Sequence, residues 1–260
     1  MTAENLSPRR VALVTGSAGG IMRGVCVGLG RRGFAVAANF RPARGGAGET
    51  VAAVRATGAT IDAFAADVSD PDQAATLVEA ARATFGRLDV VVCGAGPLLV
   101  KDVADVTTDE FRASIEGNLG SVFYTVKPAL PLLRAQRWGR IIAFGMTGSE
   151  FTMGGRHYAV YAAAKAGVVA FMKSLALEEG PHGITCNAVC PGDIRDTQAD
   201  RATVAPRSEY RNPTTRPGSW EDVADAVCFL ASDAASFING SVLTVNGGWQ
   251  GFFAKYSRWP

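Results

Sequence analysis

Two tyrosines and one lysine stand close together in the segment "RHYAVYAAAK", residues 156–165. Tyr161 lies four residues before Lys165, and Tyr158 lies seven residues before it. Residues with these spacings share one face of a helix, so a helical segment would line up all three side chains. An ammonium group beside a phenol stabilises the phenolate and lowers the pKa of the tyrosine. The spacing therefore predicts a proton donor on this face, and either tyrosine fits.

The elements that must position this segment alternate along the chain. Apolar runs rich in β-branched residues alternate with Ala-rich segments of helical spacing, such as residues 71–85 and 108–133. Continuous apolar strands separated by helices are typical of a parallel sheet covered on both faces. The sequence thus predicts an α/β, doubly wound, three-layer Rossmann fold, with residues 1–260 as a single domain. The strands are expected at residues 10–15, 34–40, 60–67, 88–96, 139–145, 184–192 and 241–248.

Composition narrows the class of protein. The formal net charge is +2 and no basic block stands out, so we expect no nucleic-acid or anionic-membrane partner. The first ten residues are polar, and no apolar run reaches the ~20 residues of a membrane span, which indicates a soluble, cytoplasmic protein. Five cysteines without paired spacing and only two histidines predict no metal site and no disulfide framework.

One stretch, residues 193–219, breaks the alternation. It is rich in Arg, Pro, Thr and Asp and follows the carboxyl end of an expected strand, where open α/β sheets bind ligands. It is expected to be either a mobile substrate lid or a plain surface excursion.

A glycine-rich turn follows the first expected strand directly. The segment "TGSAGGIMRG", residues 15–24, opens the helix after that strand. Glycines let backbone N–H groups approach a pyrophosphate, and a helix N-terminus favours an anion. The context predicts a dinucleotide site here.

Together with this turn, "YAAAK" (161–165), "CPGDI" (190–194) and "LTVNGGW" (243–249) resemble the short-chain dehydrogenase/reductase family. The motifs follow the family's order from about Arg10 to Trp249. The resemblance implies a nicotinamide cofactor, a small-molecule substrate, and a homotetramer or homodimer. It also implies that Tyr161 and Lys165 form the proton-transfer pair.

The resemblance also assigns the other site residues. Asn118 matches the family's proton-relay asparagine, and Asp67 matches the acid that meets the adenine. Gly16 and Gly20 match the phosphate loop, and Pro191 and Gly192 the turn beside the nicotinamide. The expected cofactor contacts are Gly16, Ser17, Gly20, Ile21, Met22, Asn39, Arg41, Asp67, Val68, Gly94, Ala95, Lys165, Pro191, Gly192 and Ile194.

The end of the second strand favours one of the two nicotinamide cofactors. An acid there would bond the ribose hydroxyls and repel a 2′-phosphate. Here Asn39 is neutral, and Arg41 can pair with a phosphate. We therefore expect NADP(H), with NAD(H) less favoured.

The sequence departs from the family pattern in three places. Met22 replaces the last glycine of the turn, so either its side chain turns away or the cofactor sits differently. Residues 93–96 read Cys-Gly-Ala-Gly where the family has Asn-Asn-Ala-Gly. Met146 replaces the serine that polarises the carbonyl, and a thioether cannot donate a hydrogen bond.

Because of the last departure, the sequence does not decide which kind of bond the enzyme reduces. A shifted loop could bring Thr147 or Ser149 into the donor's place, or both hydroxyls could satisfy local backbone groups. Enoyl reductases of the family place the tyrosine where Tyr158 stands, and pteridine reductases carry both tyrosines. We expect an NADPH-dependent reductase of a carbonyl, of the 3-oxoacyl or another small-ketone type, with Tyr161, Lys165, Asn118 and Thr147 as catalytic residues and Met146 and Tyr158 facing the substrate. The alternatives are reduction of an activated C=C or pterin-like C=N bond, and a degenerate member that binds without turnover.

Overall fold

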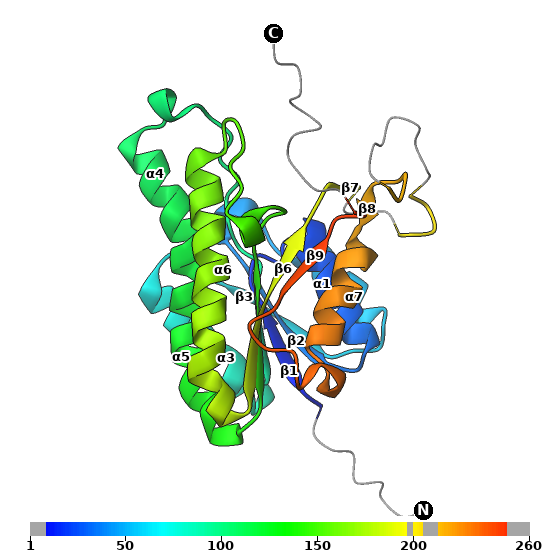
Figure 1. Cartoon of the computed structure of the whole chain (residues 1–260). Coiled ribbons are helices and arrows are strands. Elements are labelled where there is room, and N and C mark those ends of the chain that lie inside the picture. Colours follow the sequence, from blue (N-terminus) through cyan, green and yellow to red (C-terminus); the bar gives the residue numbers. More distant parts are fainter. Residues whose placement is uncertain (1–8, 197–199, 205–212, 249–260) are drawn as a thin grey trace, which may run out of the picture.

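A seven-stranded, fully parallel sheet forms the centre of the molecule (Figure 1). The computed structural model describes residues 9–196, 200–204 and 213–248. The strand order is β3-β2-β1-β4-β5-β6-β9, which confirms the doubly wound arrangement. All seven expected strands are present. They are β1 (Val11–Val14), β2 (Ala35–Phe40), β3 (Ile61–Ala65), β4 (Val90–Cys93), β5 (Gly139–Phe144), β6 (Ile184–Pro191) and β9 (Val242–Val245).

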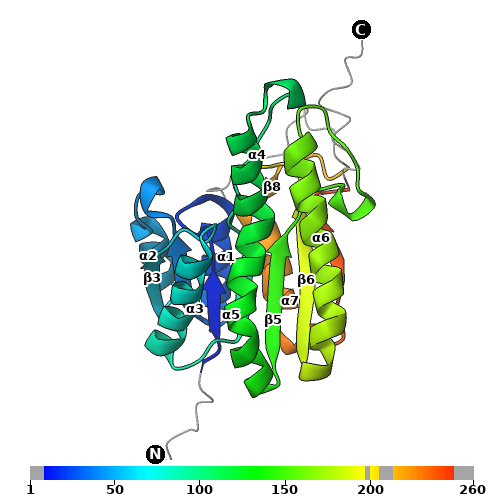
Figure 2. The same ribbon diagram turned by 90° about the vertical axis from the view of Figure 1, so that its left-hand side faces the viewer.

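Helices cover both faces of this sheet (Figures 1 and 2). One layer holds α3 (Pro71–Phe85), α5 (Ser121–Gln136) and α6 (Ala159–Glu179), and the other holds α1 (Gly20–Arg31), α2 (Gly48–Arg55) and α7 (Trp220–Leu230). Short 3₁₀ turns lie at Pro42–Arg44, Val103–Asp105, Ser149–Phe151, Gly180–His182 and Asp233–Ala235.

Each strand contributes to two cores. In β1, Ala12 and Val14 pack with α1 and α7, whereas Val11 and Leu13 pack with α3 and α5 on the other face. Successive side chains of a strand point to opposite faces, and both faces are covered here, so every position of β1 is apolar. This is the physical reason that the strands were readable in the sequence.

The expected helix over residues 108–133 is interrupted. It consists of α4 (Thr108–Ile115), a π-helical turn (Glu116–Gly120) and α5, and Asn118 lies in the π-helical turn. The break was not expected from the sequence. Such turns widen a helix locally and are frequent at functional sites.

The stems of the 193–219 stretch are joined by a small sheet. Strand β7 (Ile194–Asp196) pairs with β8 (Gly218–Ser219), just before α7 begins. Residues 197–199 and 205–212 of this stretch lie outside the described residues, as do Trp249 and the tail after it. Whether the stretch acts as a lid stays a prediction.

Helix α6 is long and apolar. Together with the turn to His182, it is the one helix among the described residues that is long and apolar enough to cross a membrane. Lys165 and Lys173 interrupt its apolar residues, so the helix does not contradict the expectation that no continuous apolar run has the length of a membrane span. The helix packs against β5 and β6 and buries Lys165, Val168 and Met172 on that face, as a helix that covers one side of a sheet does.

Candidate active site

The predicted site residues come together at one edge of the sheet, because the carboxyl ends of parallel neighbouring strands meet there. The loops after β1 and β4 are joined through Thr15, whose Oγ1 accepts hydrogen bonds from the amides of Gly94 (3.1 Å) and Ala95 (3.2 Å). The loops after β5 and β6 are joined by Thr147, whose Oγ1 donates to the carbonyl of Pro191 at 3.0 Å. At the same edge, the amide of Gly192 donates to Val245, and Ile194 follows in β7.

The glycine turn fits a pyrophosphate. Gly16 has φ 74°, and a β-carbon there would lie 2.9 Å from Ala95 Cα, so only glycine fits. Gly20 also has positive φ, but a β-carbon there would meet no atom within 4 Å, so open space faces this position. Gly19 caps α1 without any side-chain hydrogen bond, which leaves the first amides of the helix for an anion.

Two expected cofactor contacts support the turn from behind. Ser17 is fully buried, and its Oγ donates to the carbonyls of Asn39 (2.8 Å) and Val14 (3.2 Å). Asn39 is 1% exposed, and its amide donates to the carbonyls of Phe64 and Ala66. Both side chains are thus occupied by the backbone. Ile21 and Val68 likewise pack into the cores.

Met22 turns away from the pyrophosphate position. Its side chain is 6% exposed and belongs to the core between the sheet and α1. A β-carbon at Gly94 would lie 2.5 Å from Met22 Cγ and closer still to its sulfur. Of the two arrangements that the sequence left open, the structure has the one in which the methionine points inward.

A salt bridge marks the expected adenosine end. Arg41 Nε lies 2.8 Å from Asp67 Oδ2, and the Arg41 side chain is 58% exposed. The other carboxylate oxygen of Asp67 accepts from the amide and hydroxyl of Ser69. The exposed guanidinium remains accessible to a phosphate from the solvent side.

The two tyrosines and the lysine lie close together at the start of α6. Lys165 is 5% exposed, and its Nζ donates to the Phe144 carbonyl at 2.8 Å and lies 5.6 Å from the centre of the Tyr161 ring. Tyr158 caps the helix instead of lying within it. Its ring is nevertheless 6.3 Å from that of Tyr161, centre to centre, so both phenols border the same site.

Burial dominates the protonation of this pair. Desolvation, with smaller effects of Tyr158 and Cys190, raises the pKa of Tyr161 to about 12. Desolvation also lowers the pKa of Lys165 to about 8. The direction for Tyr161 is opposite to the one expected from the sequence. The physical reason is that loss of water disfavours the charged phenolate, and the neighbouring Tyr158 and Cys190 raise the pKa further.

Asn118 lies directly behind this site. Its Nδ2 donates to the carbonyls of Pro97 (3.0 Å) and Ser114 (2.9 Å), whereas its buried Oδ1 accepts no hydrogen bond. An unpaired buried acceptor is costly unless something else pairs with it. The π-helical turn thus presents an acceptor to the loop after β4.

The position of the missing serine is filled by Met146, which is 5% exposed. Ser149 Oγ accepts from the amide of Met146 at 3.0 Å. Since Thr147 donates to Pro191, both candidate hydroxyls are bonded to backbone groups in this structure.

Two further residues brace the site and were not assigned from the sequence. Glu150 accepts from the amide of Gly148 (2.9 Å) and the hydroxyl of Thr244 (3.1 Å), tying the loop after β5 to β9. Asp102 Oδ1 lies 2.7 Å from Nδ1 of His157, whose φ is 66°. No sequence signal pointed to either residue.

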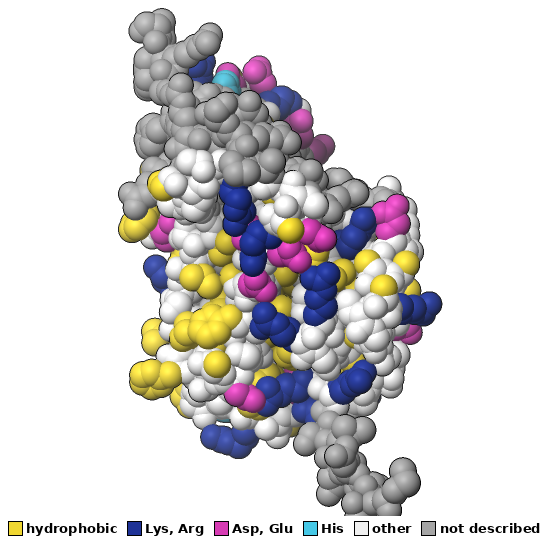
Figure 3. Space-filling model, turned by 90° about the vertical axis from the view of Figure 1, so that its right-hand side faces the viewer, with side chains coloured by type: hydrophobic (Ala, Val, Ile, Leu, Met, Phe, Trp, Pro, Cys, Tyr) yellow, Lys and Arg dark blue, Asp and Glu magenta, His cyan; other side chains and the backbone are white. Residues whose placement is uncertain are grey.

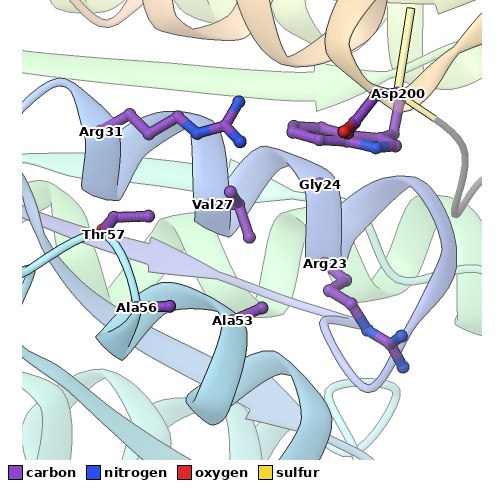
Figure 4. A pocket seen from close by; sticks show the side chains of 9 residues that line it. Arg23, Gly24, Val27, Arg31, Ala53, Ala56, Thr57 and Asp200 are labelled. Atoms are coloured by element: carbon purple, nitrogen blue, oxygen red, sulfur yellow. The ribbon is translucent and has the colours of Figure 1, made fainter. Parts of the chain in front are cut away.

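A cavity among the described residues lies elsewhere. It has a volume of about 520 Å³ and lies between α1, α2 and Trp220, on the other face of the sheet from α6 (Figure 4). None of the predicted site residues lines it. On the surface over this face, Lys and Arg side chains are interspersed with Asp and Glu (Figure 3). The described residues contain no cluster of three His, Cys, Asp or Glu side chains that could hold a metal.

Comparisons with known proteins agree with this geometry. A family model described as enoyl-(acyl carrier protein) reductase matches residues 16–250. The chain is 37% identical to the 3-oxoacyl-[acyl-carrier-protein] reductase FabG of Salmonella typhimurium, over 92% of this chain and 96% of that protein. It is 35% identical to L-rhamnose 1-dehydrogenase (NAD(P)(+)) of Sphingomonas sp. (strain SKA58), over 92% and 95%.

A solved structure gives the same result. Acetoin dehydrogenase YohF from Salmonella typhimurium superposes with a TM-score of 0.85 and 29% identity, covering 97% of this chain and 99% of that one. The match spans the sheet, both helical layers and the loops that carry the site. The chain therefore belongs to the short-chain dehydrogenase/reductase family and is an NAD(P)-dependent oxidoreductase.

Proposed function

We propose that the protein is an NADPH-dependent reductase that adds hydride to a carbonyl group, of the 3-oxoacyl type or of another small ketone. The observation that carries the proposal is the buried Tyr161–Lys165 pair beside the carboxyl end of β5. The names of the relatives support it, because a 3-oxoacyl reductase and a sugar dehydrogenase both work on a carbon–oxygen bond.

The cofactor choice rests on the end of β2. Arg41 is an exposed cation held beside Asp67, and no acid stands at Asn39 to repel a 2′-phosphate. The amides at the start of α1 would bind the pyrophosphate, and Asp67 would meet the adenine. When bound, the reduced nicotinamide supplies the hydride.

The protein's own part is to move a proton. A pKa of about 12 keeps Tyr161 protonated at neutral pH, so its hydroxyl donates to the oxygen on which negative charge develops. Lys165 is the cation next to it, and its Nζ is fixed by the Phe144 carbonyl. Asn118 offers its unpaired Oδ1 to the proton relay behind the pair.

A second donor would come from Thr147. Its hydroxyl is at the carboxyl end of β5, beside the Met146 that replaces the serine, and donates to Pro191 in this structure. Rotation about its Cα–Cβ bond would release that donor for the substrate oxygen.

One observation favours reduction of a C=C or pterin-like C=N bond instead. Tyr158 borders the same site as Tyr161, and Met146 offers no donor for a ketone oxygen. The description of the matching family model also concerns an enoyl reductase.

The cofactor claim is tested by titrating purified protein with NADPH and with NADH. The proposal predicts tighter binding of NADPH than of NADH. Arg41→Ala should raise the Kd for NADPH by about tenfold to a hundredfold and leave the Kd for NADH nearly unchanged. Arg55→Ala, an exposed arginine on α2, serves as the charge-matched control. Equal binding of the two nucleotides would refute the NADP(H) preference.

We further propose that the enzyme works in the cytoplasm as a homotetramer or homodimer. Phe111 on α4 and Phe123 on α5 are 48% and 42% exposed, and exposed aromatic side chains on neighbouring helices suit a subunit interface.

A further inference from the structure

The segment from Thr15 to Met22, which joins β1 to the first turn of α1, packs against the end of β4 at three points. The Thr15 hydroxyl bonds the amides of Gly94 and Ala95. Gly16 approaches Ala95 so closely that a β-carbon would lie 2.9 Å from its Cα. Met22 fills the third point, where its sulfur and Cγ cover the face of Gly94.

This third contact joins two departures from the family that are far apart in sequence. A side chain at position 94 would overlap Met22, and its β-carbon would also lie 3.0 Å from the Thr15 carbonyl. Conversely, Met22 can turn inward because position 94 has no side chain. A larger residue at 22 is thus matched by a smaller one at 94.

The contact bears on the dinucleotide site because of what each partner holds. Met22 is in the first turn of α1, whose amides have no side-chain cap. Gly94 begins the loop after β4, which forms the opposite wall of the turn. A change in their spacing changes the width between the first amides of α1 and that wall.

We propose that Met22 and Gly94 act as one positioning unit that sets this width for NADP(H), an inference that rests on the proposed cofactor site. The methionine side chain takes the volume that a side chain at position 94 would need. Neither residue needs to touch the cofactor for the pair to control its binding.

The test is a double-mutant cycle with Met22→Ala, Gly94→Asn and the double variant. Met22→Ala removes the two atoms that would clash, Cγ and Sδ, and keeps the helix propensity of the first turn. In the wild-type background, Gly94→Asn should raise the Kd for NADPH by about tenfold, because the new side chain displaces Met22. In the Met22→Ala background the same substitution should change the Kd by less than about threefold.

Urea unfolding of the protein without nucleotide gives a second readout. Gly94→Asn should lower the midpoint in the wild-type background and leave it nearly unchanged in the Met22→Ala background. Gly48→Asn is the matched control, because Gly48 is exposed, is not among the glycines with positive φ and would meet no atom within 4 Å. A side chain there displaces nothing, so both readouts should stay near the wild-type value.

Equal effects of Gly94→Asn on the Kd in both backgrounds would overturn the proposal. It would also be overturned if the urea midpoint depended on the background while the Kd stayed unchanged, because the pair would then have only a structural role. Failure of the wild-type protein to bind either nucleotide would instead refute the proposed function. In that case the urea cycle still decides whether the two residues act as a unit.

Discussion

The choice between the two phenols is decided at the scale of single residues. Tyr161 lies in α6 near the ammonium of Lys165, whereas Tyr158 caps the helix and faces Tyr161 at 6.3 Å between ring centres. Tyr161→Phe should lower kcat by about 10²- to 10⁴-fold, the usual contribution of a general acid, with the Kd for NADPH unchanged. Tyr158→Phe should mainly raise KM. Loss of turnover in Tyr158→Phe alone would reverse the assignment.

In the proposed function, Thr147 donates the hydrogen bond that a serine donates in the family. Thr147→Val keeps the shape of the side chain and removes its donor, so kcat for a ketone should fall by about 10²-fold, as when an oxyanion donor is removed. Ser149→Ala is the comparison, because the Ser149 hydroxyl accepts from the Met146 amide. Initial rates at saturating NADPH measure both. A loss of less than about twofold in Thr147→Val would exclude the threonine as donor.

The depressed pKa of Lys165 makes stability depend on pH. Burial lowers this pKa from 10.5 to about 8, so between these values the unfolded chain binds more protons than the native protein. Stability from this group therefore rises as the pH increases through that window. The free energy of unfolding of wild type relative to Lys165→Met should rise by roughly 3 kcal/mol from pH 7 to 10.5. Urea titrations of both proteins measure it, and a constant difference would contradict the burial argument.

At the scale of elements, the start of α7 holds the stems of the 193–219 stretch. Asp222 forms a capping box with Ser219 and accepts hydrogen bonds from Arg201 and Arg216. Burial alone would raise the pKa of Asp222, but the bonds from Arg216, Ser219 and Arg201 outweigh it and hold the pKa well below its usual range.

Asp222→Asn should therefore lower the free energy of unfolding by about 2–3 kcal/mol at pH 7. This difference should shrink as the pH falls below about 4, because the protonated carboxyl of the wild type no longer has the favourable interactions of the carboxylate. If residues 193–219 act as a lid, the KM of the Asp222→Asn variant for its substrate should rise while its Kd for NADPH stays the same. Asp225→Asn, half exposed and also bonded to Arg201, should cost less than about 1 kcal/mol. Equal losses in the free energy of unfolding of the two variants would mean that Asp222 stabilises the start of α7 no more than Asp225 does.

The elements differ in how far the sequence predicts them. The central strands could be located because two-sided burial makes them largely apolar, although the edge strand β3 exposes Asp62. Helix α3 could be located because its periodic segment begins after the N-cap Asp70 and ends before Gly86 in the left-handed region. The π-helical turn at Asn118 could not, because its i→i+5 pairing has no sequence period of its own. The inward turn of Met22 depends on Gly94, which is 72 positions later in the chain and contacts it only after folding.

At the scale of the whole molecule, the parallel order of the strands explains why these distant residues converge. The loops after β1, β4, β5 and β6 lie side by side only because the strands do, and each supplies one part of the site. The sequence motifs predicted those parts. The distances between them, and the backbone partners of Thr147 and Ser149, are properties of the folded sheet.

The most direct test of the central claim is the initial rate of NADPH consumption with a 3-oxoacyl thioester and with the 2-enoyl thioester of the same chain length. Carbonyl reduction by Tyr161 predicts a higher kcat/KM for the 3-oxoacyl substrate. This activity should be lost in Tyr161→Phe and reduced when NADH replaces NADPH. Consumption with the enoyl thioester alone, unaffected by Tyr161→Phe, would contradict it.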